Sequence, residues 1–327
     1  MRWLAYLVLL LGGTAHADWQ RSHWDVMGTR ATLEFWRDAP VANHNGIDPA
    51  EQAIRDEFAR INQLLSPWIA ESELAQVNAH AAQQPVEISP EFMQLLQRSK
   101  YYYRLTNGAF DVSFAGAGAL YDYRAAQQPD DAALARARAC LGFDFVRLEQ
   151  GSVRFTCNAV RIDLGGIAKG YAIDRAVSLL REHGISHAYI SLGGDSYVLG
   201  DRQGRPWQVG IRHPRDAEAV AMRVPVSDIA VSTSGDYERF FIANGERIHH
   251  IINPSTGKSS KGLVSVTILA PQGIDADALS TSVFVLGKDR GLELVNRLDN
   301  VSAIIIDDNG SVYYSEDLVS ADAAGAR

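Results

Sequence analysis

The segment Asp163–Asp174, DLGGIAKGYAID, decides how the middle of the chain folds. A short apolar run at 160–164 precedes it and predicts a strand, and an amphipathic pattern at 168–183 predicts a helix that ends at Gly184. Adjacent glycines and a lysine at such a junction favour an anion site, because backbone N–H groups and the helix dipole both attract negative charge. The segment is therefore central to the fold prediction and to the search for a site.

Three interpretations of this segment are open: a phosphate loop, part of a metal site, or a tight turn in which Asp163 caps the helix. It lacks the GxxxxGK[ST] spacing of a P-loop, because no serine or threonine follows Lys169, and it also lacks GxGxxG. Gly165 and Gly166 would let a ligand approach the backbone closely. Taken alone, the segment favours the turn.

Outward from this segment, helical patterns precede it and strand patterns dominate after it. Apolar residues recur at helical spacing over 54–65, behind Asp48-Pro49 as N-cap and first-turn proline, and further helices begin at Ser72 and Ser89. Later helices are predicted at 277–286 and 291–298. Strands are predicted at 143–148, 153–156, 188–192, 207–211, 219–224, 229–232, 240–242, 248–252, 263–270, 302–306 and 312–314. This order predicts an α+β chain with largely antiparallel sheets and one parallel crossover around 160–192.

The composition is that of a folded globular protein with a sizeable core. The chain has 327 residues, of which 46% are apolar and 21% are charged, and its formal net charge is −8. That charge offers no basic surface for nucleic acid. A bound anion would therefore need a local positive group or a metal ion.

The first 17 residues read as a cleavable signal peptide. Arg2 precedes an apolar run at 3–11, and Ala15-His16-Ala17 has the small-x-small pattern of a cleavage site. The run is shorter than the ~20 residues that span a bilayer. The alternative to a signal peptide is an N-terminal helix that belongs to the core. No cysteine follows the site to carry a lipid anchor, and no later segment is apolar enough to span a membrane. We expect a periplasmic protein whose residues 18–327 form one domain of two closely packed lobes.

The chain has two cysteines, Cys140 and Cys157. An oxidising compartment would permit a disulfide between them, whereas two buried free thiols fit the sequence equally well. Neither belongs to a CxxC pair, so neither indicates a redox motif or a zinc site.

Two further patterns could carry chemistry. Asp277 and Thr281 are four residues apart on a predicted helix, so their oxygens share one face and suit a hard cation such as Mg²⁺. Alternatively, Asp277 favours the helix N-terminus and Thr281 bonds back to a carbonyl. His250 ends a predicted strand and is either a general base or a structural histidine. A serine hydrolase is disfavoured because the chain has no GxSxG elbow.

Eight short motifs follow one another along the chain. They are MGT at 27–29, SPW…SEL…N at 66–78, GAFDVS at 108–113, DLGGIAKGYAID at 163–174, SLGGD at 191–195, STSGDYERF at 232–240, HHIINPSTG at 249–257 and DADALSTSVFVLG at 275–287. In this order they resemble the ApbE family of FAD:protein FMN transferases, from Met27 to about Leu298. The resemblance implies a T-fold-related, two-lobed α+β architecture with largely antiparallel sheets flanked by helices.

The resemblance also implies which residues bind ligands. The positions implied to contact FAD are Met27, Trp68, Ala109, Phe110, Asp111, Asp163, Lys169 and Ile252. The Mg²⁺ ligands would be Asp277, Thr281 and the backbone carbonyl of Gly166. Trp68 stands where relatives often have tyrosine, and either ring can stack on a flavin or adenine. His250 is the candidate for accepting the hydroxyl proton, with Asp277 as its rival.

The activity implied is Mg²⁺-dependent transfer of the FMN part of FAD to a threonine or serine hydroxyl of a partner protein, with release of AMP. The partners expected are periplasmic flavin-accepting domains of membrane electron-transfer proteins. Two alternatives remain open: an FAD pyrophosphatase that releases FMN and AMP, and a non-catalytic flavin-binding carrier. The chain departs from the family at 114–121, where many relatives have a segment with proline and tryptophan, and it lacks the lipid-anchor cysteine that relatives often carry.

Overall fold

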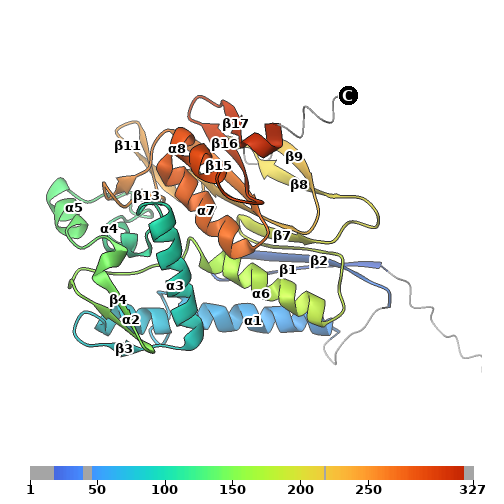
Figure 1. Ribbon diagram of the computed structural model, residues 1–327, viewed down its shortest axis with the longest axis horizontal. Helices are drawn as coiled ribbons and strands as arrows, with labels where there is room; N and C mark the ends of the chain where they lie inside the picture. Colours follow the sequence, from blue (N-terminus) through green and yellow to red (C-terminus); the bar gives the residue numbers. More distant parts are fainter. Residues whose placement is uncertain (1–17, 40–45, 217–218, 320–327) are drawn as a thin grey trace, which may run out of the picture.

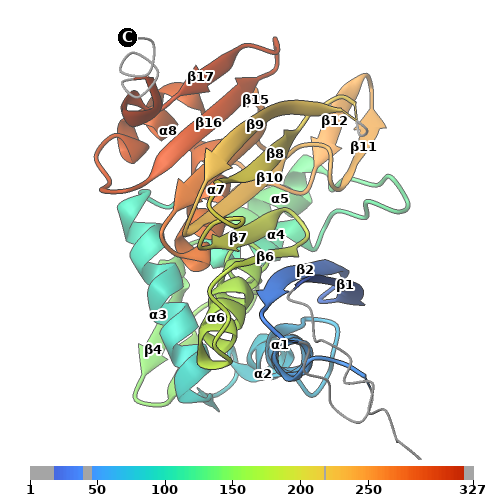
Figure 2. The same cartoon turned by 90° about the vertical axis from the view of Figure 1, so that its right-hand side faces the viewer.

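A computed structural model describes residues 18–39, 46–216 and 219–319. The predicted signal peptide lies outside these residues. The dominant feature is an eight-stranded sheet in the order β1-β2-β6-β7-β10-β15-β16-β17, in which every neighbouring pair is antiparallel. Figure 2 shows it running from β16 and β17 at one end to β1 and β2 at the other. Its strands are β1 Asp18–Val26, β2 Thr29–Arg37, β6 Ala188–Leu192, β7 Asp195–Leu199, β10 Ile229–Gly235, β15 Leu263–Ala270, β16 Ser302–Asp307 and β17 Val312–Tyr314.

Helices cover one face of this sheet, as Figure 1 shows. They are α1 Pro49–Leu65, α6 Ala168–Glu182, α7 Gly273–Leu286 and α8 Lys288–Val295. Successive side chains of these strands point to opposite faces of the sheet. Ala230 and Ile268 belong to the core beneath the helices, whereas Val231 and Leu269 belong to a second cluster that includes Trp207. A ribbon of β8 Trp207–Arg212 and β9 Val220–Val226 supplies that second cluster. All residues of β15 are buried, because both faces of this central strand are covered.

A smaller group of elements lies beside the helical layer. It contains α2 Glu73–His80, α3 Pro90–Leu105, α4 Ala115–Gly118 and α5 Asp131–Arg138, together with the sheet β3 Val86–Glu87, β5 Ser152–Phe155 and β4 Val146–Glu149. Two short hairpins, β11 Phe240–Ala243 with β12 Glu246–His249 and β13 Ile252–Asn253 with β14 Lys258–Ser259, complete the fold. The α+β class with antiparallel sheets is thus confirmed.

Local signals located most helix starts correctly. Asp48 accepts a hydrogen bond from the Ala50 amide at the start of α1, and Ser72 and Ser89 cap α2 and α3 in the same way. The helix predicted at 277 begins earlier, at Gly273, because its first amides are capped from another helix. The Asp174 carboxylate accepts from the amides of Gly273 and Ile274 at 2.6 and 2.9 Å.

Two strand predictions were wrong. Residues 160–164 form no strand: the Asn78 side chain accepts from the Ile162 amide and donates to its carbonyl, both at 2.8 Å, and so takes the place of a partner strand. The parallel crossover expected there is absent, since all strand pairs in the described ranges are antiparallel. Phe143–Phe145, expected to begin a strand, forms a 3-10 turn. The β1–β2 hairpin was not predicted.

Candidate functional site

Helices α6 and α7 cross at two glycines. A Cβ added to Gly170 would lie 2.1 Å from the Gly273 carbonyl oxygen, and one added to Gly273 would lie 2.6 Å from the Gly170 carbonyl oxygen. Only residues without side chains permit this approach. Because Lys169 and Asp277 lie within a turn of these glycines, the crossing brings the two predicted site segments together.

At the crossing, one lysine faces two buried carboxylates. Lys169 Nζ lies 2.8 Å from Asp195 Oδ2 and 3.4 Å from both oxygens of Asp277, and it donates to the Gly165 carbonyl at 3.0 Å. The Gly170 amide donates to Asp277 Oδ2 at 3.0 Å. Asp195 and Asp277 are each only 3% exposed. Buried charges of this kind must be paired, so the three side chains form one electrostatic unit.

The surroundings shift the pKa values of these groups. Burial, reinforced by the neighbouring Asp195 carboxylate, raises the pKa of Asp277. Burial would lower the pKa of Lys169, but the carboxylates of Asp195 and Asp277 outweigh it and raise that pKa. The carboxylates therefore favour the charged form of Lys169, which supplies local positive charge in a protein whose formal net charge is −8.

A chain of hydroxyls extends the site onto the sheet. Ser280 Oγ lies 3.1 Å from Ser232 Oγ and 2.8 Å from Ser234 Oγ, and Ser232 in turn donates to Asp195. Thr281 Oγ1 lies 3.3 Å from Ser234 Oγ. The strand β10 thereby fixes the positions of the α7 hydroxyls.

The loop between Asp163 and α6 is folded back on itself. Asp163 Oδ1 accepts from the Gly165 amide at 2.6 Å, and burial raises the pKa of Asp163. The suggestion that Asp163 caps the helix is wrong, because the N-cap position of α6 is Ile167, which makes no side-chain cap. The Asp163 amide donates to the Val112 carbonyl at 2.9 Å, which joins this loop to the 108–113 motif.

Gly166 lies where the loop before α6 meets α7 and the 108–113 motif. A Cβ on Gly166 would be 3.3 Å from Thr281 Oγ1 and 3.4 Å from the Phe110 ring. Beside Phe110, Asp111 accepts from the Ser113 amide and hydroxyl at 2.9 and 2.8 Å, and burial raises its pKa to about 6. The structure thus brings Gly166 close to the predicted ligand Thr281.

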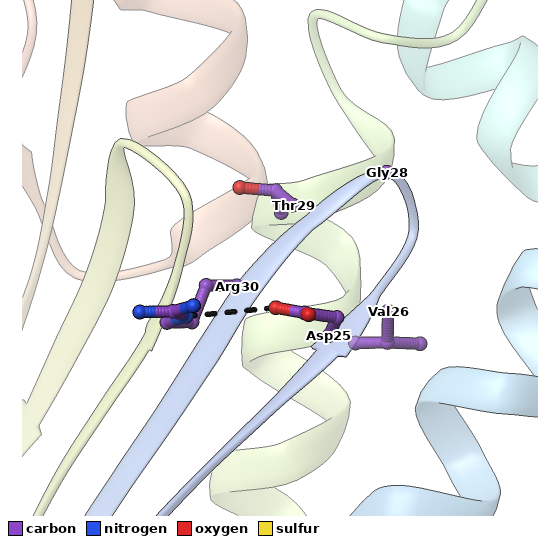
Figure 3. Close-up of a pocket in the computed structure, with 5 residues that line it drawn as sticks. All are labelled: Asp25, Val26, Gly28, Thr29 and Arg30. Atoms are coloured by element: carbon purple, nitrogen blue, oxygen red, sulfur yellow. Dashed lines mark ion pairs between the residues drawn. The ribbon is translucent and has the colours of Figure 1, made fainter.

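Met27 and Gly28 form the tight turn between β1 and β2, and Thr29 begins β2. A surface hollow of about 630 Å³ lies at this turn. Figure 3 shows the residues that line it, which are Asp25, Val26, Gly28, Thr29 and Arg30. The turn packs on the SLGGD motif, since the Gly193 amide donates to the Arg30 carbonyl at 3.0 Å. It therefore lies beside Gly193, two residues before Asp195 at the start of β7.

His250 and Ile252 follow the β11–β12 hairpin. The His250 amide donates to the Arg239 carbonyl at 3.1 Å, while its buried Nδ1 has no hydrogen-bond partner. Burial and the charge of Arg239 lower the pKa of His250 to about 4. His249 is the structural member of the pair, with Nε2 2.8 Å from the Ser260 carbonyl. Ile252 is buried.

Trp68 and Ala109 are less buried than Phe110 and Asp111. Trp68 lies in the turn after α1 with 90% of its surface exposed, so its ring is accessible to a ligand but not held by packing. Ala109 is half-buried immediately before Phe110.

The oxygen donors at the crossing fit a hard divalent cation. A carboxylate on Asp277, a hydroxyl on Thr281 and the nearby backbone of Gly166 are the donor types that Mg²⁺ prefers. No cluster of three His, Cys, Asp or Glu side chains with metal-binding geometry occurs in the described part of the chain. Main-chain and hydroxyl oxygens, and oxygens of the substrate, would therefore have to complete the coordination.

Sequence reasoning missed Asp195, Asp174 and Asn78 as parts of the site. Asp195 pairs with Lys169, Asp174 caps α7 and Asn78 holds the backbone before Asp163. All three lie within the quoted motifs, but their partners are distant in the sequence. Within the described ranges, no helix combines the length and apolar character needed to cross a membrane.

Comparisons with known proteins agree on one family. The model of the ApbE family matches residues 27–305. A Treponema pallidum protein named FAD:protein FMN transferase is 34% identical over 304 residues, which is 86% of this chain and 82% of that protein. One of the same name from Vibrio cholerae is 28% identical, covering 95% of each chain.

Solved structures show the same likeness. A crystal structure of the ApbE protein from Thermotoga maritima superimposes with a TM-score of 0.82 at 30% identity, over 92% of this chain and 98% of that one. The flavin transferase ApbE from Vibrio cholerae has a TM-score of 0.82 at 26% identity, over 93% of this chain and 99% of that one.

Proposed function

This chain belongs to the ApbE family of flavin transferases, and we propose that it transfers the FMN part of FAD to a threonine or serine hydroxyl of a partner protein. In this reaction the hydroxyl oxygen bonds to the FMN phosphorus and the phosphoanhydride bond to AMP breaks. The hydroxyl proton passes to a base, and AMP leaves. The observation that carries the proposal is the convergence of Gly166, Lys169, Asp277 and Thr281 at the α6–α7 crossing.

The residues at the crossing suit an anionic substrate. Lys169 would offer positive charge to the pyrophosphate of FAD, and the Asp195 carboxylate would hold the ammonium in place. Asp277, Thr281 and the Gly166 carbonyl would hold Mg²⁺. When bound, Mg²⁺ would supply the charge that stabilises a pyrophosphate as its bond breaks.

The remaining predicted positions would bind or orient the rest of FAD. Met27, the Ala109–Asp111 segment, Asp163 and Ile252 would line the pocket, and the exposed Trp68 ring would stack on an aromatic ring of FAD. These assignments rest on the family resemblance, and for the Ala109–Asp111 segment also on the contacts of Phe110 with Gly166 and of Val112 with Asp163.

His250 is our candidate base. Its Nδ1 is unpartnered and its pKa is lowered to about 4, so the imidazole is neutral near pH 7 and can accept a proton. Asp277 is the rival base, but as a metal ligand it would be less free to take the proton.

The test is an assay with purified protein, FAD, Mg²⁺ and a candidate acceptor domain. Transfer predicts an acceptor heavier by one FMN group in intact-mass spectrometry, together with AMP. Free FMN and AMP with an unmodified acceptor would instead identify an FAD pyrophosphatase. Unchanged FAD that stays bound would identify a carrier.

We propose further that the protein acts in the periplasm on flavin-accepting domains of membrane electron-transfer proteins. The supporting observation is the signal-peptide pattern that ends at Ala17. Expression of the full chain in a bacterium should yield, in the periplasmic fraction, a protein whose N-terminal residue is Asp18. A product that retains residues 1–17 in the cytoplasm would contradict the export proposal.

A further inference from the structure

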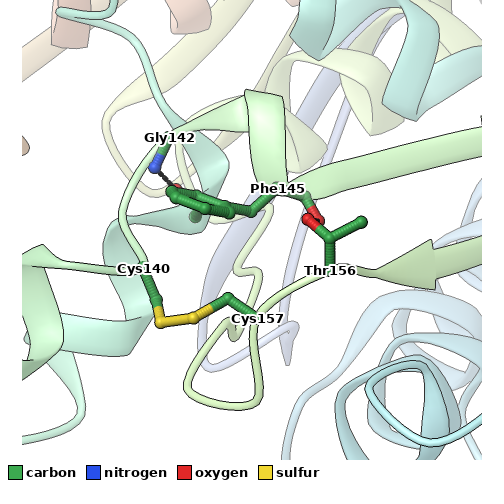
Figure 4. Close-up of a disulfide and its surroundings, with 6 residues drawn as sticks. Cys140, Gly142, Phe145, Thr156 and Cys157 are labelled. Atoms are coloured by element: carbon green, nitrogen blue, oxygen red, sulfur yellow. Dashed lines mark hydrogen bonds between the residues drawn. A yellow bond between two sulfur atoms is a disulfide. The ribbon is translucent and has the colours of Figure 1, made fainter.

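Cys140 and Cys157 form a disulfide in the smaller group of elements, with 17 residues of sequence separation and a Cα–Cα distance of 5.8 Å. Figure 4 shows it linking the loop after α5 to the loop after β5. Nearby, the Thr156 amide donates to the Phe145 carbonyl at 2.9 Å, so covalent and hydrogen bonds close the same loop. The disulfide therefore fixes the path of the chain on both sides of β4 and β5.

A buried serine connects this loop to the Phe110–Asp111 segment. The Gly142 amide, two residues beyond Cys140, donates to Ser113 Oγ at 2.7 Å. Ser113 Oγ in turn donates to Asp111 Oδ2 at 2.8 Å, and the Ser113 amide donates to Asp111 Oδ1 at 2.9 Å. Ser113 is 0% exposed, so water cannot replace these bonds if the hydroxyl is lost.

The orientation of the Gly142 amide depends on the loop conformation. Gly142 has φ of 130°, a region that residues with side chains rarely adopt. Holding the chain at Cys140 limits how far this glycine can relax. The disulfide thus helps to keep the Gly142 amide oriented toward Ser113 Oγ.

The path of contacts that runs from Cys140 through Gly142 and Ser113 to Asp111 continues to the proposed FAD site. Val112, between Asp111 and Ser113, accepts from the Asp163 amide at 2.9 Å, and Phe110 packs against Gly166. A displacement of the 110–113 segment would therefore move both sides of the site.

We propose that Ser113 is a positioning residue through which the Cys140–Cys157 disulfide holds the Phe110–Asp111 segment in its FAD-binding conformation. The inference rests on the proposed function, because it takes this segment as part of the FAD pocket. Ser113 itself does not touch the reacting atoms. Its loss weakens FAD binding and leaves the transfer step at saturating FAD intact.

The test is a double-mutant cycle on FAD affinity, measured by flavin fluorescence without Mg²⁺ so that no turnover occurs. Its four proteins are the wild type, Ser113→Ala, the Cys140→Ser/Cys157→Ser pair and the triple variant. We expect Ser113→Ala to raise Kd for FAD about tenfold, the effect of a lost buried hydrogen bond. We expect the disulfide variant to raise it several-fold, and the triple variant to bind no more weakly than Ser113→Ala alone, because both changes break one path.

Kinetics separate positioning from general destabilisation. With Mg²⁺ and an acceptor domain, Ser113→Ala should raise KM for FAD and change kcat by less than about twofold. Val153→Ala is the matched control, since Val153 is fully buried in β5 of the same small sheet but lies off the path. It should lower Tm without changing Kd for FAD.

Three results would overturn the proposal: an unchanged Kd in Ser113→Ala, additive effects in the triple variant, or an equal rise in Kd in Val153→Ala. If Ser113→Ala does not fold, the disulfide variant tests the same path, and an unchanged Kd in it would overturn the proposal. A wild-type protein that binds FAD without transferring FMN would contradict the proposed function alone. Normal transfer with an unaffected Ser113→Ala variant would contradict this inference alone.

Discussion

Lys169 is the residue on which the electrostatics of the site depend. One ammonium group faces the buried carboxylates of Asp195 and Asp277, so the cluster holds fewer positive than negative groups. A divalent cation at Asp277 would correct this imbalance, and Lys169 would remain paired with Asp195. The arrangement therefore suits the metal ion and the anionic substrate that we propose.

Asp277→Ala should abolish Mg²⁺-dependent turnover, with a loss of at least about a hundredfold in kcat, because the only charged metal ligand proposed is removed. The measurement is AMP release from FAD across an Mg²⁺ titration. Asp275→Ala is the matched control: it lies on the same helix, but its carboxylate binds Arg98 and Tyr102 and not Lys169. Wild-type rates in Asp277→Ala would remove Asp277 as a ligand.

His250 should titrate far below an ordinary histidine. Burial and the charge of Arg239 lower its pKa to about 4, so folding disfavours its protonated form. The stability linked to His250 is present above the unfolded-state pKa of about 6.5 and is lost as pH falls from there toward about 4. An NMR titration of the His250 ring in the free protein should show a midpoint near the lower value. A midpoint near 6.5 would mean that the imidazole is solvated.

His250→Ala should slow FMN transfer by about a hundredfold or more, the usual contribution of a general base, without a large loss of FAD affinity. Rates are measured at saturating FAD, and affinity by flavin fluorescence. Transfer at full speed in this variant would leave Asp277 as the candidate base.

At this scale the sequence located several site residues but not their partners. Asp277 and Thr281 could be paired because helical spacing is local, and the structure places both on α7. Asp195 could not be assigned a role, because Lys169 approaches it from 26 positions earlier in the chain, on another element. Contacts of that kind depend on tertiary packing, which local patterns do not encode.

Among the elements, the α6–α7 crossing is the one that assembles the site. The two helices are held by the glycine contact and by Asp174, which caps α7 from within α6. One segment, Asp163–Asp174, thus supplies the lysine, the glycine contact and the cap for the partner helix. The tight turn is confirmed, since Asp163 accepts from the Gly165 amide, whereas the metal-site interpretation stays a prediction.

Gly170→Ala should destabilise the protein by about 1–3 kcal/mol through overpacking. This is opposite to the gain of about 1 kcal/mol that alanine gives over glycine in an unobstructed helix. The added Cβ would lie 2.1 Å from the Gly273 carbonyl oxygen and 2.7 Å from Asp277 Cβ. Urea unfolding at constant m-value measures the change, and Glu182→Ala at the exposed end of α6 serves as control. A Gly170→Ala protein as stable as the wild type would show that the helices are not in close contact.

Helices and strands were predicted well where a cap residue or an alternating pattern marks them in the sequence itself. Caps at Asp48, Ser72 and Ser89 located three helices, and alternation located most strands. The strand expected at 160–164 has the right pattern of burial but bonds to Asn78 instead of a strand. Periodicity indicates which side chains are buried, but it does not indicate which group forms hydrogen bonds with the backbone.

For the whole molecule, the strand order was beyond sequence reasoning. The sheet places β2 beside β6, and β10 beside β15, so strands far apart in the chain become neighbours. This order brings the MGT turn, the SLGGD motif and the middle of α7 to one region of the fold. The Gly193 amide donates to the Arg30 carbonyl, and Ser232 bonds to both Asp195 and Ser280. The fold class was predictable from patterns, whereas the strand order was not, because pairing between distant strands leaves no local signal in the sequence.

Loss of the disulfide should cost about 3 kcal/mol of unfolding free energy, the value expected for closing a loop of this length. The Cys140→Ser/Cys157→Ser variant should therefore unfold at a lower urea concentration than the wild type. Each protein is measured with and without a reductant, and the variant should not respond to it. Equal midpoints for the two proteins would show that the disulfide does not stabilise the native state.

The central claim is that this chain moves FMN from FAD to a protein hydroxyl. The most direct measurement counts AMP released and FMN attached in one reaction with FAD, Mg²⁺ and an acceptor domain, using intact-mass spectrometry for the acceptor. We predict one attached FMN for each AMP, and neither product with Asp277→Ala. AMP accompanied by free FMN and an unmodified acceptor would contradict the claim.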